Sequence, residues 1–243
     1  LDAGCFGLGL VETKLNGQYV LHLKRIWVPQ PLRRQYKYQV ALIENTLRPE
    51  VFIHVGTGKT GTTFLQYRVF PFLKGITYIQ RTRYKRAEDI IGSGKYQRLF
   101  FSREFDRQME AEVKAFASFC PEATPIVVFR QHHSYMASQF RRFTKNGYRF
   151  TFDEFIDLKN DRGFFRHKHL NYLGQVELLR RHFNCAPLVF LYEDLRRDPK
   201  GFIRKMAELT GTTVEVDQLN LAAKHRSYNE QQLKAIQWLG KYI

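Results

Sequence analysis

The amino-acid sequence predicts an α/β fold in which a mostly parallel central sheet is flanked by helices. From residue 50 onward, short β-branched and aromatic runs alternate with longer segments of helical periodicity, as in βαβ units. A glycine-rich turn directly follows the first of these runs, which predicts a strand-loop-helix phosphate-binding loop. The 243 residues, 44% of them hydrophobic, are enough for one large domain with an apolar core.

The first 49 residues differ from the rest and are predicted to form an N-terminal extension (1–49) of unknown role, followed by the main domain (50–243). Asn16 and Gly17 make the strongest short hairpin signal, because both residue types tolerate the positive φ angles of a tight turn. The signal predicts a β-hairpin with strands at 9–14 and 19–28.

Four apolar runs in the main domain predict strands at 51–55, 99–102, 125–129 and 187–192. Apolar residues at helical spacing predict helices at 62–71, 107–119, 134–144, 169–183, 199–210 and 230–242. At least one helical segment separates each pair of consecutive strands, and such a crossover lets neighbouring strands run parallel.

The charge is strongly positive, since 39 Lys and Arg face 23 Asp and Glu, a net charge of +16. Such a field attracts nucleic acid, membrane headgroups, or a multiply phosphorylated cofactor with an acidic acceptor. A basic nucleic-acid-binding module is one alternative, but no reader motif is found, so no nucleic-acid partner is expected. No run of 18 apolar residues predicts a membrane span. The sequence does not indicate an oligomeric state.

The three cysteines, Cys5, Cys120 and Cys185, are widely spaced and form no C-x-x-C pair or cluster at zinc spacing. We therefore expect no metal site. The odd number favours a reducing compartment, and a cytoplasmic location is expected. Because the first residue is Leu rather than Met, a lumenal catalytic fragment of an anchored protein is the alternative.

The glycine-rich turn carries several groups that bind anions. It comprises Gly56, Thr57, Gly58, Lys59, Thr60, Gly61, Thr62 and Thr63. The glycines let the backbone approach an oxyanion, Lys59 supplies a charge, and the threonines at 60, 62 and 63 supply hydroxyl donors. The helix that follows adds the positive end of its dipole. The turn is therefore predicted to bind a phosphate-like group.

A nucleoside-triphosphate loop of the form G-x-x-x-x-G-K-[ST] is the first alternative for this turn. The Gly58-Lys59-Thr60 triplet fits its end, but the position that requires the first glycine is Ile53. This mismatch disfavours an ATP-dependent small-molecule or nucleotide kinase, which would need Mg²⁺ and ATP.

Residues 54–66, H-V-G-T-G-K-T-G-T-T-F-L-Q, resemble the 5′-phosphosulfate loop of sulfotransferases that use 3′-phosphoadenosine 5′-phosphosulfate (PAPS). The family core reads P-K-[ST]-G-T-[ST], and Gly58 stands where the family usually has Pro, which implies a more flexible loop. The resemblance implies an enzyme that transfers a sulfuryl group from PAPS to a hydroxyl or amine of a small-molecule or carbohydrate acceptor. The product would be adenosine 3′,5′-bisphosphate (PAP), and no metal is required. Phe64 sits where the family places an aromatic against adenine.

Two further segments resemble the family's 3′-phosphate site. Arg130 follows the strand at 125–129, and Ser138 comes eight residues later, as in the motif R-x7-S. Near the C-terminus, Arg226 and Ser227 lie in a basic segment similar to the loop that closes over the same phosphate. Residues 190–199 resemble the segment Y-E-D-L-x-x-[DN]-P, a strand followed by a turn into a helix, whose role is structural.

Sulfuryl transfer needs a base for the acceptor's proton and a cation for the leaving phosphate oxygen. Lys59 suits the second task. Glu104 is the leading base, because it follows the strand at 99–102 at the edge where α/β sheets bind ligands. Family branches that act on sugars often use Glu there, whereas the cytosolic small-molecule branch has His. A Glu base requires burial or a neighbour that raises its pKa.

Other assignments remain open for these residues. Glu104 can instead form a salt bridge with Arg103 or Arg107. His133 and His132 follow Arg130 closely and are the alternative bases. Acceptor contacts are expected within 74–98 and 144–170, which are rich in Arg, Lys, Tyr and Phe. This composition suits a sugar or an acidic acceptor, and equally a solvated basic face.

Overall fold

The computed structural model describes residues 5–15, 18–28, 48–222 and 231–232. The chain divides into two compact units, Leu1–Pro49 and Glu50–Ile243. None of the helices in the described ranges is long and apolar enough to cross a bilayer.

The first unit contains two antiparallel strands of 11 residues each, β1 (Cys5–Leu15) and β2 (Gln18–Val28). Leu15 is paired with Gln18, so the connection comprises residues 16 and 17 alone. The first strand begins four residues before the predicted start at residue 9.

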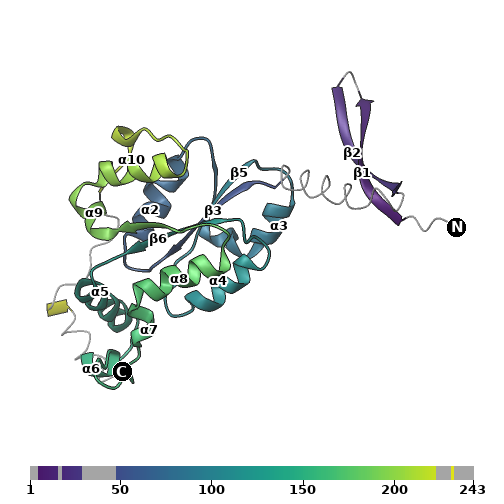
Figure 1. Ribbon diagram of the computed structural model, residues 1–243. Coiled ribbons are helices and arrows are strands. Elements are labelled where there is room, and N and C mark those ends of the chain that lie inside the picture. Colours follow the sequence, from purple (N-terminus) through teal and green to yellow (C-terminus); the bar gives the residue numbers. More distant parts are fainter. Residues whose placement is uncertain (1–4, 16–17, 29–47, 223–230, 233–243) are drawn as a thin grey trace. The chain divides into compact units, whose positions relative to one another are not determined.

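The second unit is built on a five-stranded parallel sheet with the order β4-β5-β3-β6-β7 (Figure 1). The strands are β3 (Glu50–Gly56), β4 (Thr77–Ile79), β5 (Arg98–Ser102), β6 (Thr124–Phe129) and β7 (Leu188–Leu191). The predicted α/β class and parallel sheet are confirmed. Edge strand β4 was not predicted, because it has three residues and only Ile79 among them is buried.

Helices connect the strands. They are α2 (Thr62–Arg68), α3 (Ala87–Gly92), α4 (Met109–Ala117), α5 (His132–Lys145), α6 (Phe152–Phe155), α7 (His167–Leu170), α8 (Tyr172–His182), α9 (Tyr192–Arg197) and α10 (Pro199–Leu209). Short 3₁₀ turns occur at η2 (Phe70–Phe72), η3 (Arg81–Arg86) and η4 (Val216–Gln218).

Several predicted elements differ from those of the structure. The segment predicted as one helix at 62–71 ends at Arg68, and Pro71 lies in the 3₁₀ turn that follows. The predicted helix at 169–183 is split into α7 and α8, because Asn171 caps α8 by accepting a hydrogen bond from the Gly174 N–H. The turn predicted after β7 is instead the helix α9. The predicted helix at 230–242 lies outside the described residues except for 231 and 232.

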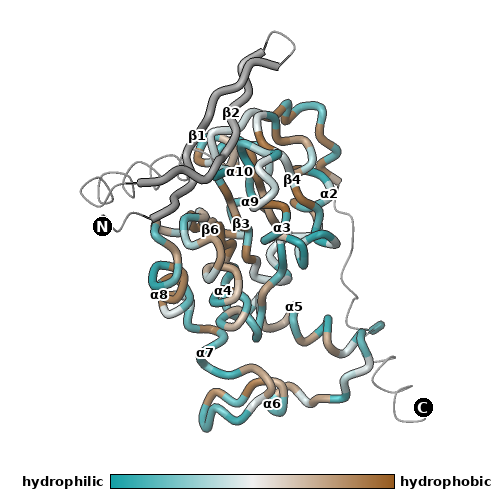
Figure 2. Tube along the Cα trace, turned by 90° about the vertical axis from the view of Figure 1, so that its right-hand side faces the viewer, coloured by the Kyte–Doolittle hydropathy of each residue, from teal (hydrophilic) through white to brown (hydrophobic). Residues whose placement is uncertain are grey.

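Alternate residues of the strands face two separate apolar layers. On β3, Phe52 packs with α2, α9 and α10, whereas Ile53 and Val55 pack with α3, α4 and α8. Figure 1 shows these two groups of helices on opposite faces of the sheet, and Figure 2 shows the hydrophobic stretches along β3 and β6. Burial of each large apolar side chain contributes about 1.5–3 kcal/mol, so both faces of the sheet are stabilised.

A third apolar cluster joins α5 to the segment around α6. Its buried members are Tyr135, Met136, Phe155, Ile156 and Phe165, with Phe140, Phe143, Phe150, Phe164 and Leu170 packed against them. Many of the aromatics within 144–170 therefore pack against one another. The carboxyl ends of the parallel strands β3, β5 and β6 meet at one end of the sheet, where the candidate site lies.

Candidate active site

The glycine-rich loop is closed by hydrogen bonds of its own. The N–H of Thr57 donates to the Val128 carbonyl at 3.1 Å, which ties the loop to β6. The hydroxyls of Thr60 and Thr62 both donate to the Thr57 carbonyl, at 2.5 and 3.0 Å. These two hydroxyls, predicted as anion donors, hold the shape of the loop.

The backbone of the loop presents N–H groups without acceptors. Among the described residues, the N–H groups of Lys59, Thr60 and Gly61 have no hydrogen-bond acceptor, and those of the first turn of α2 have none within the helix. Gly61 has a φ of 84°, and a Cβ there would lie 2.7 Å from Leu195 Cδ2. The positive φ and this close approach favour glycine at position 61. The consecutive N–H groups without a described acceptor suit the binding of an oxyanion.

Lys59 is half-buried among charged groups. Its pKa lies below the ordinary lysine value, mainly because burial penalises the ammonium and secondarily because Arg142 is nearby. The charge of Glu104 opposes this shift in pKa. Lys59 is therefore a partly desolvated cation that interacts with a carboxylate at the same edge of the sheet.

Glu104 is placed by an extension of the strand pairing. The N–H of Arg103 donates to the His54 carbonyl, and the N–H of Phe105 donates to the Val55 carbonyl, both at 2.8 Å. Burial raises the pKa of Glu104, and the negative charge of Asp106 raises it further. Arg81, Arg142 and Lys59 act in the opposite direction. A raised pKa is the direction that a general base near neutral pH requires.

The salt bridge considered for Glu104 is not formed with either neighbouring arginine. The guanidinium of Arg103 lies over the Tyr84 ring, 5.6 Å from its centroid, and that of Arg107 lies 3.9 Å from the Phe164 centroid. Both arginines contact aromatic rings instead, so this alternative was wrong.

His132 and His133, the two alternative bases, are the first two residues of α5 and do not lie in a loop. The Nε2 of His132 is 2.8 Å from the Leu170 carbonyl, and its ring stacks on Tyr172 at 4.3 Å. His133 is exposed. Within the described part of the chain, neither histidine forms a hydrogen bond or ion pair with Lys59 or Glu104.

Arg130 lies directly against the glycine-rich loop. Its Nη1 donates to the Lys59 carbonyl at 2.9 Å, and its Nε donates to Ser134 Oγ at 2.9 Å. The guanidinium also lies over Tyr192, 4.5 Å from the ring centroid. Burial lowers the pKa of Arg130. The arginine predicted to bind the 3′-phosphate thus contacts the backbone of the loop predicted to bind the 5′-phosphosulfate.

The remaining predicted donor-site residues occupy different surroundings. Ser138 is buried one helical turn after Ser134, and residues at this spacing share a helix face. Phe64 is half-buried and packs against the apolar layer of α2, α9 and α10. Arg226 and Ser227 lie outside the described residues.

Asp106 was not predicted as a site residue, yet it accepts hydrogen bonds from the loop and from α5. Its only sequence signal is an acidic residue two positions after Glu104. Sequence analysis also missed a buried polar chain, in which Gln66 Nε2 donates to Ser102 Oγ at 3.0 Å and Ser102 Oγ lies 2.9 Å from His54 Nδ1.

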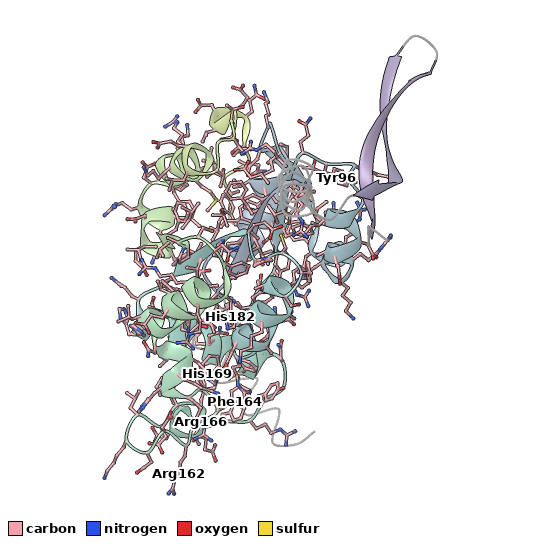
Figure 3. All side chains as sticks on the ribbon, turned by 45° about the vertical axis from the view of Figure 1, so that its right-hand side comes forward. Tyr96, Arg162, Phe164, Arg166, His169 and His182 are labelled. Atoms are coloured by element: carbon pink, nitrogen blue, oxygen red, sulfur yellow. The ribbon has the colours of Figure 1, made fainter. Side chains whose placement is uncertain are left out.

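Beside α4 lies a cavity of about 250 Å³. It is lined by Asp106, Arg107, Met109, Glu110, Lys168, His169, Asn171, Gly174, Gln175, Leu178 and Arg181. Figure 3 labels His169 and the nearby Phe164. The Oε1 atom of Gln175 is buried without a described partner. No described group of three or more His, Cys, Asp or Glu residues is arranged to hold a metal ion.

Comparisons with known proteins indicate one family. A family model for the sulfotransferase domain matches residues 118–242, just over half of the chain. The match includes Arg130 and Ser138 and begins after the glycine-rich loop and Glu104. No curated protein matches the chain.

Solved structures with a similar fold include a sulfotransferase from Alicyclobacillus acidocaldarius, at 16% identity and a TM-score of 0.48. That comparison covers 79% of this chain and 92% of the other. A mouse sulfotransferase complexed with PAP is similar at 17% identity and a TM-score of 0.45, with 79% of this chain and 64% of the other covered.

Proposed function

The chain belongs to the sulfotransferase family, whose enzymes transfer sulfuryl groups, and we propose that its donor is PAPS, bound by the loop at 56–63. The acceptor is a hydroxyl or amine of a small molecule or carbohydrate. One observation carries the proposal: the 2.9 Å hydrogen bond from Arg130 to the Lys59 carbonyl brings the guanidinium and the glycine-rich loop side by side. A donor with phosphate groups at both its 5′ and 3′ positions fits such a pair.

The free N–H groups of the loop fit the 5′ end of the donor. Three consecutive backbone donors, at residues 59–61, have no described acceptor, and Lys59 adds a partly buried positive charge. In the proposed arrangement Arg130 and Ser138 bind the 3′-phosphate, and Phe64 lies against the adenine. Arg226 and Ser227 remain proposed ligands of the same phosphate.

Glu104 and Lys59 have separate roles in the proposed reaction. Glu104 accepts the proton of the acceptor as the acceptor's oxygen or nitrogen forms its bond to sulfur. The bond between sulfur and the bridging phosphate oxygen breaks, and Lys59 stabilises the negative charge that this oxygen gains. The raised pKa of Glu104 and its charge interaction with Lys59 support this division.

The cavity beside α4 is the proposed place of the acceptor. Asp106 forms part of its wall and also contacts the phosphate loop, so the cavity adjoins the donor site. Arg107, Lys168 and Arg181 form no salt bridge with a described carboxylate. These cations favour an acceptor that carries an acidic group, and the buried Oε1 of Gln175 can accept a hydrogen bond from a hydroxyl.

Ligand-dependent thermal stability tests the proposed donor. PAP without divalent metal should raise the melting temperature, because a ligand that binds only the folded state stabilises it by about 2.7 kcal/mol at 100 times its Kd. ATP with Mg²⁺ should not. Protection by ATP with Mg²⁺ but not by PAP would sink the proposal in favour of a kinase. Salt-dependent binding to RNA or DNA, with no response to PAP, would favour the nucleic-acid module.

A further inference from the structure

The carboxylate of Asp106 is held at four points. It accepts hydrogen bonds from the Gly58 N–H at 2.9 Å, Tyr135 Oη at 3.2 Å, Gln139 Nε2 at 3.1 Å and Arg142 Nη1 at 2.8 Å. Only 7% of its side chain is exposed. A buried carboxylate with this many donors has a fixed position, because losing any one partner leaves a charge poorly compensated.

The hydrogen bond between Gly58 and Asp106 requires that residue 58 has an N–H and no side chain. A proline at position 58, the usual residue of the family, has no N–H and cannot make this hydrogen bond. A Cβ at position 58 would lie 2.8 Å from Asp106 Oδ2 and 3.0 Å from Arg142 Nη1. The absence of both the ring and the side chain at position 58 therefore makes room for the carboxylate and the guanidinium beside the loop.

The other three donors come from one face of α5. Tyr135, Gln139 and Arg142 follow one another at spacings of four and three residues, which places them along a single helix face. Gln139 also donates to Tyr135 Oη at 2.9 Å. Asp106 thus connects the phosphate loop to the helix that carries Ser138.

We propose that Asp106 is a positioning residue, whose carboxylate fixes the phosphate loop through the Gly58 N–H and holds Arg142 beside that loop. In this chain the hydrogen bond replaces the rigidity that proline gives other members of the family. This inference rests on the proposed function for its effect on PAP. The fixed shape of the loop is independent of any ligand.

A double-mutant cycle on PAP affinity tests the link. Asp106→Ala removes the acceptor and Gly58→Pro removes the donor of one charge-assisted hydrogen bond. Each variant should therefore weaken PAP binding by about tenfold, measured by calorimetry. The double variant should be no weaker than the worse single variant, because both remove the same contact. Asp217→Ala, which removes an exposed charge paired with Lys200, is the matched control and should bind PAP normally.

Hydrogen exchange separates this inference from the proposed function. The amides of residues 56–63 should exchange faster in Asp106→Ala than in wild type or Asp217→Ala, whether or not PAP binds. If wild type fails to bind PAP, the proposed donor is wrong, but the exchange rates of the loop amides still test the role of Asp106. If Asp106→Ala does not fold, the exchange rates in Gly58→Pro provide the test. Unchanged loop exchange, or additive losses of affinity, would overturn the inference.

The dependence of kcat/KM on pH would not change if Asp106 had only a structural role. Glu104 is faced by the negative charge of Asp106 and by the positive charges of Arg81, Arg142 and Lys59. Asp106→Asn removes the like charge, so the acid limb of kcat/KM should move to lower pH in any variant that still turns over. A limb at the wild-type pH would contradict an effect of Asp106 on the base.

Discussion

Arg130 donates a 2.9 Å hydrogen bond from Nη1 to the carbonyl oxygen of Lys59. Arg130 follows β6, whereas Lys59 follows β3, the neighbouring parallel strand. The contact joins the two proposed phosphate sites, and the second terminal nitrogen of Arg130, Nη2, donates to no acceptor among the described residues.

Arg130→Ala should weaken the binding of PAP more than that of adenosine 5′-monophosphate, which lacks the 3′-phosphate. We expect a loss of about tenfold or more for PAP and a smaller one for the monophosphate, because a charged hydrogen bond contributes about 1.5–3 kcal/mol. Calorimetric titration of both nucleotides checks this, with the exposed Arg197→Ala as control. Equal losses for the two ligands would show that Arg130 only supports the loop.

Lys59→Ala should reduce kcat by roughly 10²–10³-fold, the usual cost of removing one donor to a developing negative charge. The affinity for the donor PAPS should fall much less, because the bridging oxygen gains its charge only as the bond to sulfur breaks. Steady-state kinetics with PAPS, together with PAPS titration in the absence of acceptor, separate the two effects. The exposed Lys205→Ala is the control, and parallel losses in kcat and PAPS affinity would assign Lys59 to binding alone.

Glu104→Gln should abolish turnover and leave PAP affinity intact, because glutamine keeps the shape but cannot accept the proton. The exposed Glu208→Gln removes a similar charge far from the sheet edge and should retain full activity. Near-normal turnover in the Glu104 variant would instead move the base to His133 or His132.

The dependence of kcat/KM on pH in the wild-type enzyme should reflect the raised pKa of Glu104. Glu104 must be deprotonated to act as a base, and its pKa is raised by burial and by Asp106. Activity should therefore fall as pH decreases through a value above the ordinary glutamate range. A profile of kcat/KM against pH measures this value, and an acid limb at the pKa of free glutamate would argue against Glu104.

His54 should make the stability of the fold dependent on pH. Burial lowers its pKa from 6.5 to about 3, so the folded state keeps it neutral while the unfolded chain gains a proton below 6.5. The contribution of neutral His54 to the free energy of unfolding is fully present above pH 6.5 and is lost as pH falls toward 3. Between pH 8 and pH 5.5 the free energy of unfolding should fall by about 1.4 kcal/mol because of this group.

Urea unfolding at the two pH values checks this dependence. Between pH 8 and pH 5.5 the free energy of unfolding should fall by about 1.4 kcal/mol more in wild type than in His54→Gln, because the two proteins share all other titrating groups. Equal losses in the two proteins would mean that His54 is not held neutral.

The sheet could be predicted because its central strands are buried on both faces. The run at 51–55 is apolar except for His54 and is followed by Gly56, a pattern typical of a strand that is buried on both faces. Edge strand β4 and helix α9 lack such patterns. Leu195 is the one buried residue of α9, so this short helix depends on packing against the apolar layer rather than on periodicity.

The shared location of Lys59, Glu104 and Arg130 could also be predicted, since each follows a predicted strand at the same sheet edge. The contacts of Asp106 could not. No spacing rule links Asp106 to Arg142, because their 2.8 Å contact depends on how α5 packs across the end of the sheet. The free loop N–H groups likewise follow from backbone geometry rather than from residue type.

Transfer of label from donor to acceptor tests the central claim most directly. The enzyme would be incubated with one acceptor panel, including acidic sugars, and either PAPS labelled in its sulfuryl group or ATP labelled in its γ-phosphoryl group with Mg²⁺. We expect sulfuryl label on an acceptor, with one PAP released per transfer, and no phosphoryl label. Phosphoryl label without sulfuryl label would contradict the account.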